Sequence, residues 1–223
     1  AGQMHHARIN VNAILLTDGK VLIIGGHDQF KWDPPSHTWD ATLEEHPQDE
    51  AEIYDPSVPF DPADPSAAFT PVASMHAART YHSTAVLLRD GRILFTGSGD
   101  GANVPQQNNY EIFSPPYLFK GARPTYNLAL TLNTAHYGQS FTVTTPDAAS
   151  IQKVPPIRHS STTHAFDAGQ RLNTLSFTKA LDGQSLTVYP PASGREAPPG
   201  PYMLFIVNDK GVPSVAQSIL LAQ

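Results

Sequence analysis

Two histidines and one tyrosine are the side chains of this chain with the most scope for chemistry. Tyr81 and His82 are adjacent, whereas His164 lies far along the chain and on its own would be an ordinary loop histidine. Imidazole and phenol groups can bind a metal ion or transfer a proton. The chain has no cysteine, so no thiolate is available as a nucleophile, a metal ligand or a crosslinking partner.

The Tyr81-His82 pair belongs to an internal repeat. Residues 4–26 realign with residues 75–97 after a one-residue gap. In each copy an apolar run meets an Asp-Gly pair and is followed by a second apolar run that ends in glycine. This pattern is typical of a β-hairpin.

The two copies differ at the residues with chemical capacity. Where the second copy has Tyr81-His82, the first has Asn10-Val11 on the same framework. A packing requirement of the repeat would be expected in both copies, so the difference favours a local role for the pair. The structural alternative is that both side chains fill the inner edge of the sheet, as most such residues do.

Each hairpin is followed by a matching short strand, and together they predict about two blades of a β-propeller. The matching strands are AEIYDP (51–56) and YEIFSP (110–115), and FTPVASM (69–75) supplies a further strand before the second hairpin. A blade cannot bury both faces alone, and propellers close with about 4 to 8 blades. We therefore expect the remaining blades to come from upstream sequence or from another chain.

The composition also favours an all-β protein. Only 15% of the residues are charged, whereas the chain has 21 prolines and 15 glycines, which suits short strands joined by turns. The net charge of −6 and the lack of any Lys/Arg run leave no electrostatic footprint for nucleic acid or an anionic membrane. No apolar run approaches the roughly 20 residues that span a bilayer. We expect neither nucleic acid nor membrane as a partner.

A change of composition at SPPYLFKGARP (114–124) predicts a domain junction. Beyond it, alternating stretches predict the strands of a sandwich of about 100 residues. These stretches are QSFTVTT (139–145), LNTLSFT (172–178), QSLTVYP (184–190), YMLFIVN (202–208) and VAQSILLA (215–222). The predicted fold is all-β, with part of a β-propeller in residues 1–115 followed by a β-sandwich in residues 116–223.

Four segments carry a more specific signal. They are RTYHSTAVLLRDGRILFTGSG (79–99), YEIFSPPYLF (110–119), STTHAFDAGQR (161–171) and APPGPYMLFIVNDKGVPSVA (197–216). In type, order and spacing they resemble the carboxy-terminal half of the galactose oxidase and glyoxal oxidase family, the kelch-type copper-radical oxidases. The resemblance implies that residues 1–115 are a partial kelch-type β-propeller and residues 116–223 an immunoglobulin-like β-sandwich. It also implies an oxidase that acts on a primary alcohol or an aldehyde and reduces dioxygen to hydrogen peroxide.

The resemblance also implies a site for one copper ion. Tyr81 would be the axial tyrosine and the base that accepts the substrate proton, His82 an equatorial ligand, and His164 the second histidine ligand. Imidazole and oxygen donors suit Cu(II). Adjacent side chains of a regular strand point to opposite faces, so Tyr81 and His82 can share a metal only where the backbone is irregular.

A second redox centre is implied as well, because copper exchanges one electron and alcohol oxidation removes two. In the family this centre is a tyrosyl radical on a tyrosine that is thioether-linked to a cysteine. Since this chain has no cysteine, we expect the crosslinked pair to lie in propeller segments that precede Ala1. The alternatives are a relative that binds copper without the crosslink, and a non-catalytic carbohydrate-binding or structural module. By resemblance alone, we expect a secreted or cell-surface protein.

Other candidate residues receive lesser roles. We interpret Arg158 and His159 as channel or interface residues and not as ligands. His5 and His76 recur at equivalent positions of the repeat, which favours a packing role over metal binding. His6 is expected to be exposed and without a partner.

An acidic stretch from Asp40 to Glu52, with Trp32 and Trp39 nearby, is a candidate border of a substrate entrance. A solvated insertion between strands is the favoured interpretation, because acidic loops of this kind usually lie in solvent.

Overall fold

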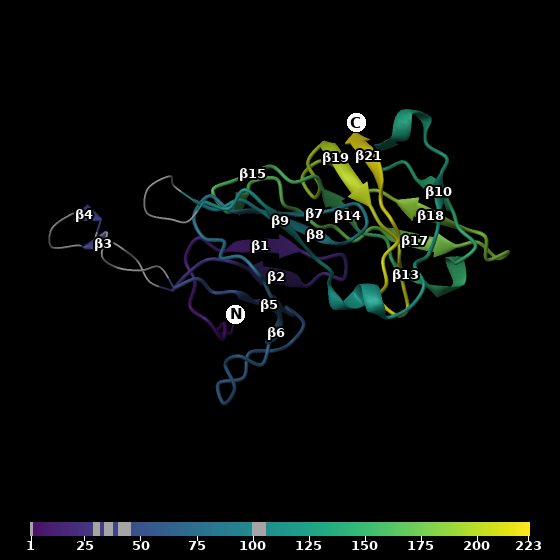
Figure 1. The fold of residues 1–223 in the computed structure, drawn as a ribbon. Coiled ribbons are helices and arrows are strands. Elements are labelled where there is room, and N and C mark those ends of the chain that lie inside the picture. Colours follow the sequence, from purple (N-terminus) through teal and green to yellow (C-terminus); the bar gives the residue numbers. More distant parts are fainter. Residues whose placement is uncertain (1, 29–31, 34–37, 40–45, 100–105) are drawn as a thin grey trace. The chain divides into compact units, whose positions relative to one another are not determined.

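The protein folds into β-strands, turns and short 3-10 helices, as the computed structural model in Figure 1 shows for residues 2–28, 32–33, 38–39, 46–99 and 106–223. The 3-10 helices of these residues are η1 (Pro116–Phe119), η2 (Thr131–Asn133) and η3 (Ala148–Ser150). None of the helices in this part of the chain is long and apolar enough to cross a membrane. The predicted all-β class is confirmed.

The strands gather into two compact units that are not continuous in sequence. The first unit comprises Ala1–Leu87, Ile93–Phe113 and Thr162–Ala168, and the second comprises Leu88–Arg92, Ser114–Ser161 and Gly169–Gln223. The segment 162–168 therefore folds with the internal repeat, although it lies well beyond it in the chain. As a result His164 shares a unit with Tyr81 and His82.

The first copy of the repeat forms a four-stranded antiparallel sheet. Its order is β1 (Asn12–Leu15), β2 (Val21–Ile24), β5 (Glu50–Tyr54) and β6 (Phe69–Ser74). β1 and β2 form the predicted hairpin, in which Leu15 pairs with Val21 and Gly19 adopts a φ of +94° in the turn. A left-handed φ of this kind favours glycine.

The second copy forms a sheet of three strands. Its order is β7 (Thr84–Leu87), β8 (Ile93–Thr96) and β9 (Tyr110–Phe113). The predicted strand FTPVASM is β6, which pairs with β5 of the first sheet. Within the described residues the second sheet therefore has one strand fewer than the first. The first unit also contains the two-stranded pairs β3 (Trp32–Asp33) with β4 (Thr38–Trp39) and β15 (Thr162–Thr163) with β16 (Phe166–Asp167).

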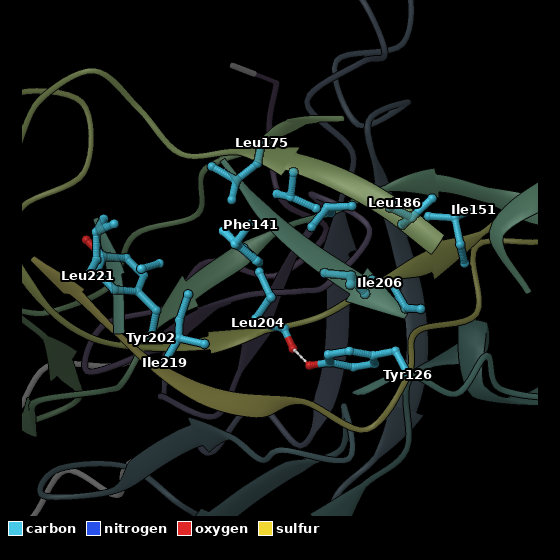
Figure 2. Packing of buried hydrophobic residues seen from close by; sticks show 14 of the residues in the cluster. Tyr126, Phe141, Ile151, Leu175, Leu186, Tyr202, Leu204, Ile206, Ile219 and Leu221 are labelled. Carbon is cyan, nitrogen blue, oxygen red and sulfur yellow. Dashed lines mark hydrogen bonds between the residues drawn. The ribbon is translucent and has the colours of Figure 1, made fainter. Parts of the chain in front are cut away.

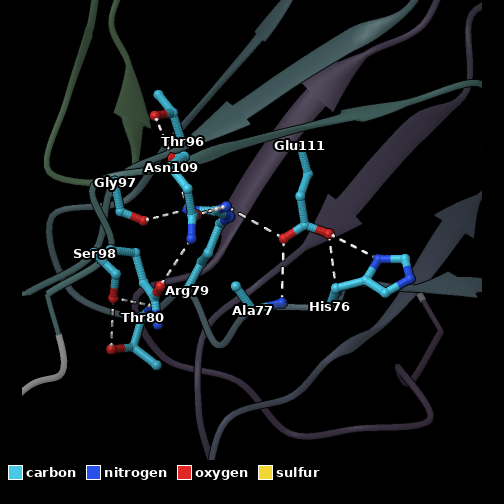
Figure 3. A network of polar contacts seen from close by, with 10 residues as sticks. His76, Ala77, Arg79, Thr80, Thr96, Gly97, Ser98, Asn109 and Glu111 are labelled. Carbon is cyan, nitrogen blue, oxygen red and sulfur yellow. Dashed lines mark hydrogen bonds and ion pairs between the residues drawn. The ribbon is translucent and has the colours of Figure 1, made fainter.

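A buried arginine ties the segment before β7 to the rest of the second sheet. Arg79 is completely buried and donates to the carbonyls of Gly97 at 3.0 Å and Asn109 at 3.3 Å (Figure 3). It also pairs with the Glu111 carboxylate at 3.2 Å. Burial acts to raise the pKa of Glu111, but hydrogen bonds from His76 and the Arg79 charge outweigh it, so the net pKa is lowered.

The first sheet repeats this arrangement. Arg8 pairs with Glu52 at 3.1 Å, both side chains are fully buried, and Arg8 also donates to the carbonyl of Gly25 at 3.1 Å. In each sheet the Arg-Glu pair holds the segment that precedes the first hairpin strand, because one guanidinium reaches several acceptors from a single position.

The second unit contains two four-stranded sheets and one short pair. The first sheet has the order β10 (Asn127–Leu128), β12 (Phe141–Thr144), β18 (Ser185–Tyr189), β17 (Ser176–Lys179). The second has the order β11 (Thr134–His136), β21 (Gln217–Ala222), β19 (Gly200–Leu204), β14 (Pro156–Arg158), and β13 (Ile151–Lys153) pairs with β20 (Val207–Asn208). All five predicted stretches contain strands, whereas β10, β11, β13 and β14 were not predicted.

Apolar side chains from both sheets form the core of this unit, as Figure 2 shows. Leu186 on β18 and Leu204 on β19 are both fully buried. Tyr126 places its ring in the same core and donates its hydroxyl to the carbonyl of Leu204. This packing of two sheets through alternating inward residues is that of an immunoglobulin-like sandwich.

Candidate functional site

Tyr81 and His82 are the two central residues of a tight turn that precedes β7. The N–H of Ser83 donates to the carbonyl of Thr80 at 3.2 Å and closes the turn. His82 has a φ of +62°, a conformation that the third position of a type II turn requires and that non-glycine residues seldom adopt. The irregular backbone expected here is confirmed, and it allows the two neighbouring rings to stack with centroids 3.9 Å apart.

Gly99 holds this turn from the far end of the second hairpin. Its N–H donates to the carbonyl of Tyr81 at 2.9 Å, and its carbonyl lies 2.8 Å from Nδ1 of His82. A carbonyl only accepts, so Nδ1 of His82 carries the proton in this contact. The Nε2 atom of a neutral His82 is then left with its lone pair free for a metal ion.

The first sheet has a different pair at the equivalent place. Asn10 lies two residues before β1, as His82 lies two residues before β7, and Asn10 also has a positive φ, of +55°. Its amide contacts Nε2 of His27 at 3.0 Å. The counterpart of His82 is therefore Asn10, and the expected match of His82 with Val11 is wrong by one residue. The extra residue of the second copy lies between Arg79 and His82.

His164 lies at the tip of the hairpin formed by β15 and β16. Thr163 pairs with Phe166, so His164 and Ala165 form a two-residue turn, and their φ angles are +52° and +61°. Two successive positive φ angles define a type I′ turn, which normally uses Asn-Gly. Each non-glycine residue held there costs about 1–2 kcal/mol. Backbone strain of this kind gathers at functional sites.

One hydrogen bond links the two turns. The N–H of Ala165 donates to the carbonyl of Ser83 at 3.1 Å, so the residue after His164 binds the residue after His82. The imidazole rings of His82 and His164 have centroids 4.7 Å apart at an interplanar angle of 69°. The Tyr81 ring lies 6.0 Å from that of His164. Residues distant in sequence thus form one cluster of three rings.

The donor set of this cluster fits copper. Two imidazoles and a phenol are ligands that Cu(II) accepts, and both histidines are solvent-exposed while Tyr81 is half-buried. Nδ1 of His164 contacts the hydroxyl of Thr163 at 2.6 Å, a neighbour that can orient the ring. In the described part of the chain no three His, Asp or Glu side chains lie close enough to share a metal, so the phenol is needed to complete a trio here.

The other histidines lie elsewhere. His159 belongs to the second unit, where Nε2 contacts the Ser218 hydroxyl at 3.2 Å, and burial, with a smaller effect of the Arg89 charge, lowers its pKa. A packing role was expected for His76, and it is wrong for the ring because the ring is 96% exposed. The residue instead donates its backbone N–H to the Glu111 carboxylate. His6 was expected to lack a partner, but it pairs with Glu50 at 2.9 Å.

Residues 40–45 of the acidic stretch lie outside the described residues, as do the side chains of Trp32 and Trp39.

Sequence reasoning also missed three contributors to the site: Ser83, Gly99 and Thr163. The pairing of β7 with β8 could have located Ser83 and Gly99 next to the turn. For Thr163 the sequence offers one signal, which is its position beside His164.

These observations define an all-β protein that combines propeller-like sheets with an immunoglobulin-like sandwich. Residues 123–221 match the family described as "Galactose oxidase-like, Early set domain". The chain is thus a homologue of the galactose and glyoxal oxidases and carries their Early set domain, as its motifs predicted.

Individual relatives support the same assignment. The chain is 32% identical over 234 residues to the aldehyde oxidase GLOX1 of Arabidopsis thaliana, across 97% of this chain and 36% of the relative. It is 30% identical over 230 residues to the galactose oxidase of Gibberella zeae, across 99% of this chain and 30% of the relative. A fungal alcohol oxidase of the AA5 family, solved in complex with copper, matches with a TM-score of 0.81 at 31% identity, across 98% of this chain and 43% of that one. The chain therefore spans less than half the length of each of these relatives.

Proposed function

We propose that this chain is part of a mononuclear copper-radical oxidase that converts a primary alcohol or an aldehyde and reduces dioxygen to hydrogen peroxide. The observation that supports this function best is the approach of His82 and His164, whose rings lie 4.7 Å apart on two strained turns. The names of the relatives, which are alcohol, aldehyde and galactose oxidases, support the same reaction class.

In this proposal His82 and His164 bind copper through imidazole nitrogens and Tyr81 binds it through the phenol oxygen. The hydrogen bond from Nδ1 of His82 to Gly99 holds the ring in the tautomer that leaves Nε2 free. When bound, copper would act as a Lewis acid that makes a substrate hydroxyl more acidic, and it would supply a one-electron redox couple. Tyr81 would accept the hydroxyl proton at its phenolate oxygen.

Oxidation of an alcohol to an aldehyde releases two electrons and two protons, and dioxygen takes up both pairs to become hydrogen peroxide. The second one-electron carrier in this proposal is a crosslinked Tyr-Cys radical, which this cysteine-free chain does not supply. It would come from propeller segments outside this chain. We assign residues 1–115 to the terminal blades of a kelch-type propeller and residues 116–223 to the sandwich. By family resemblance, we place the enzyme outside the cell.

Copper titration of the purified chain tests the site. Wild-type protein should bind one Cu(II), and its electron paramagnetic resonance spectrum should show coupling to imidazole nitrogens. His82→Ala and His164→Ala should each lose tight binding and remain folded, because both side chains lie in exposed turns. His76→Ala is the matched control, since its ring is 96% exposed and lies outside the cluster.

Unchanged copper affinity in both histidine variants would exclude the proposed site. Tight copper binding without peroxide formation, once the remaining blades are supplied, would favour a non-catalytic binding module instead.

A further inference from the structure

We infer that Asn12 and Ser83 form a positioning pair that sets the separation of His82 and His164, an inference that rests on the proposed copper site. Ser83 is completely buried and contacts both turns. Its N–H closes the turn that carries His82, at 3.2 Å from the carbonyl of Thr80. Its carbonyl accepts the N–H of Ala165 from the other turn at 3.1 Å. The two turns are thus joined through one residue.

Asn12 fixes that residue from the neighbouring sheet. It is the first residue of β1, and only 4% of its surface is exposed. Its Nδ2 donates to the Ser83 hydroxyl at 2.9 Å, and its Oδ1 accepts the N–H of Ala85 at 3.1 Å. The amide therefore binds the chain on both sides of Thr84, directly after the His82 turn. A buried amide with both ends satisfied restrains its partners closely.

The strain in the two turns explains why such an anchor is needed. His82, His164 and Ala165 all have positive φ angles, which persist only where surrounding contacts hold them. The hydrogen bond from Ala165 to Ser83 joins the two turns. If Ser83 shifts, the ring of His82 and the ring of His164 move relative to each other. Asn12 would therefore act on the copper site without touching it.

Three variants of the purified chain test this inference. Asn12→Leu fills a similar volume but removes both hydrogen bonds, and Ser83→Ala removes only the hydroxyl. Asn12→Asp keeps an acceptor for Ala85 and allows the Ser83 hydroxyl to donate, so it should restore the link. Asn10→Ala is the matched control, because it breaks an amide contact at the equivalent edge of the first sheet, with His27.

We expect Asn12→Leu and Ser83→Ala to bind Cu(II) about 10- to 100-fold more weakly than wild type, the usual effect of losing a group that orients a ligand. Their resonance spectra should show coupling to one imidazole nitrogen in place of two, while near-ultraviolet circular dichroism stays native. Asn12→Asp should recover most of the affinity, and Asn10→Ala should retain it.

Wild-type affinity and two nitrogen couplings in folded Asn12→Leu would overturn the positioning role and leave the copper site standing. If Asn12→Leu does not fold, the same comparison is made with Ser83→Ala, whose change is one oxygen atom. Absence of copper binding in the wild-type chain would overturn the proposed function and the positioning role with it.

Discussion

His82 and Gly99 hold each other through a pair of hydrogen bonds that also includes the backbone of Tyr81. Nδ1 of His82 donates to the carbonyl of Gly99 at 2.8 Å, and the N–H of Gly99 donates to the carbonyl of Tyr81 at 2.9 Å. Both bonds require the backbone of Gly99 to approach the turn closely. Gly99 has a φ of +121°, which side chains seldom tolerate.

Gly99→Ala should disturb the site and not only the stability of the fold. A Cβ atom at this position would lie 2.9 Å from Cα of Gln106, so the segment must shift. We expect copper affinity to fall together with a loss of about 1–3 kcal/mol of stability. Gly19→Ala is the control, because its φ is also positive but its Cβ would meet no atom within 4 Å. Equal copper affinity in the two variants would contradict a role for Gly99 in holding His82.

The two buried Arg-Glu pairs should differ in strength, because their surroundings differ. The carboxylate of Glu52 is fully buried against Arg8, whereas that of Glu111 is 23% exposed beside Arg79. Removing one partner of a buried pair costs about 3–5 kcal/mol, and water reduces the effect. Glu52→Gln should therefore lower the free energy of unfolding more than Glu111→Gln. Urea denaturation measures both, and the reverse order would contradict the argument.

The contribution of Glu111 to the free energy of unfolding should depend on pH. Its pKa is lowered in the folded protein, so its contribution to stability is present above the ordinary glutamate pKa. The contribution is lost as the pH falls through the folded value. Glu111→Gln should flatten the decline in stability over that acid range.

Much of the architecture could be predicted because β-structure has a period that the sequence displays. The Asp-Gly turns and alternating runs marked both hairpins, and the family motifs marked the three ring side chains. Short strands were missed where the pattern is too brief, as in β10 with two residues, Asn127 and Leu128. A strand that pairs for only two residues leaves no periodic signal.

The geometry of the site could not be predicted for a different reason. The contacts that join the two turns are long-range, as in the bond from Ala165 to Ser83, and they use backbone atoms that every residue possesses. The match of His82 with Asn10 likewise depends on strand register. A one-residue gap can be placed at several points of an alignment, whereas the start of β7 fixes it.

Ala165→Gly should stabilise the turn that carries His164. Ala165 has a φ of +61°, where alanine is strained and glycine is not. Glycine relieves the backbone strain, but it also gives the unfolded chain more conformational entropy. The net effect should raise the free energy of unfolding by roughly 0.5–1 kcal/mol. Ala67→Gly, at an exposed position without a positive φ, should instead destabilise slightly. Thermal denaturation distinguishes them, and a loss in Ala165→Gly would show that the alanine methyl contributes more than the strain costs.

Tyr126→Phe should weaken the sandwich and alter its response to alkali. The Tyr126 hydroxyl is buried, donates to the carbonyl of Leu204 and accepts the N–H of Gln217 at 2.8 Å. Its loss should cost about 1–3 kcal/mol, because the partner groups lose their bonds in the core.

Burial raises the pKa of Tyr126, so folding favours the neutral phenol. That contribution is complete below the unfolded tyrosine pKa of about 10 and is lost as the pH rises towards the folded value. Wild type should therefore become easier to denature above about pH 10, with a smaller change in Tyr126→Phe. Tyr189→Phe, which alters a ring that is 42% exposed, is the control and should follow wild type. Identical alkaline profiles for wild type and Tyr126→Phe would show that the phenol does not ionise before the protein unfolds by another route.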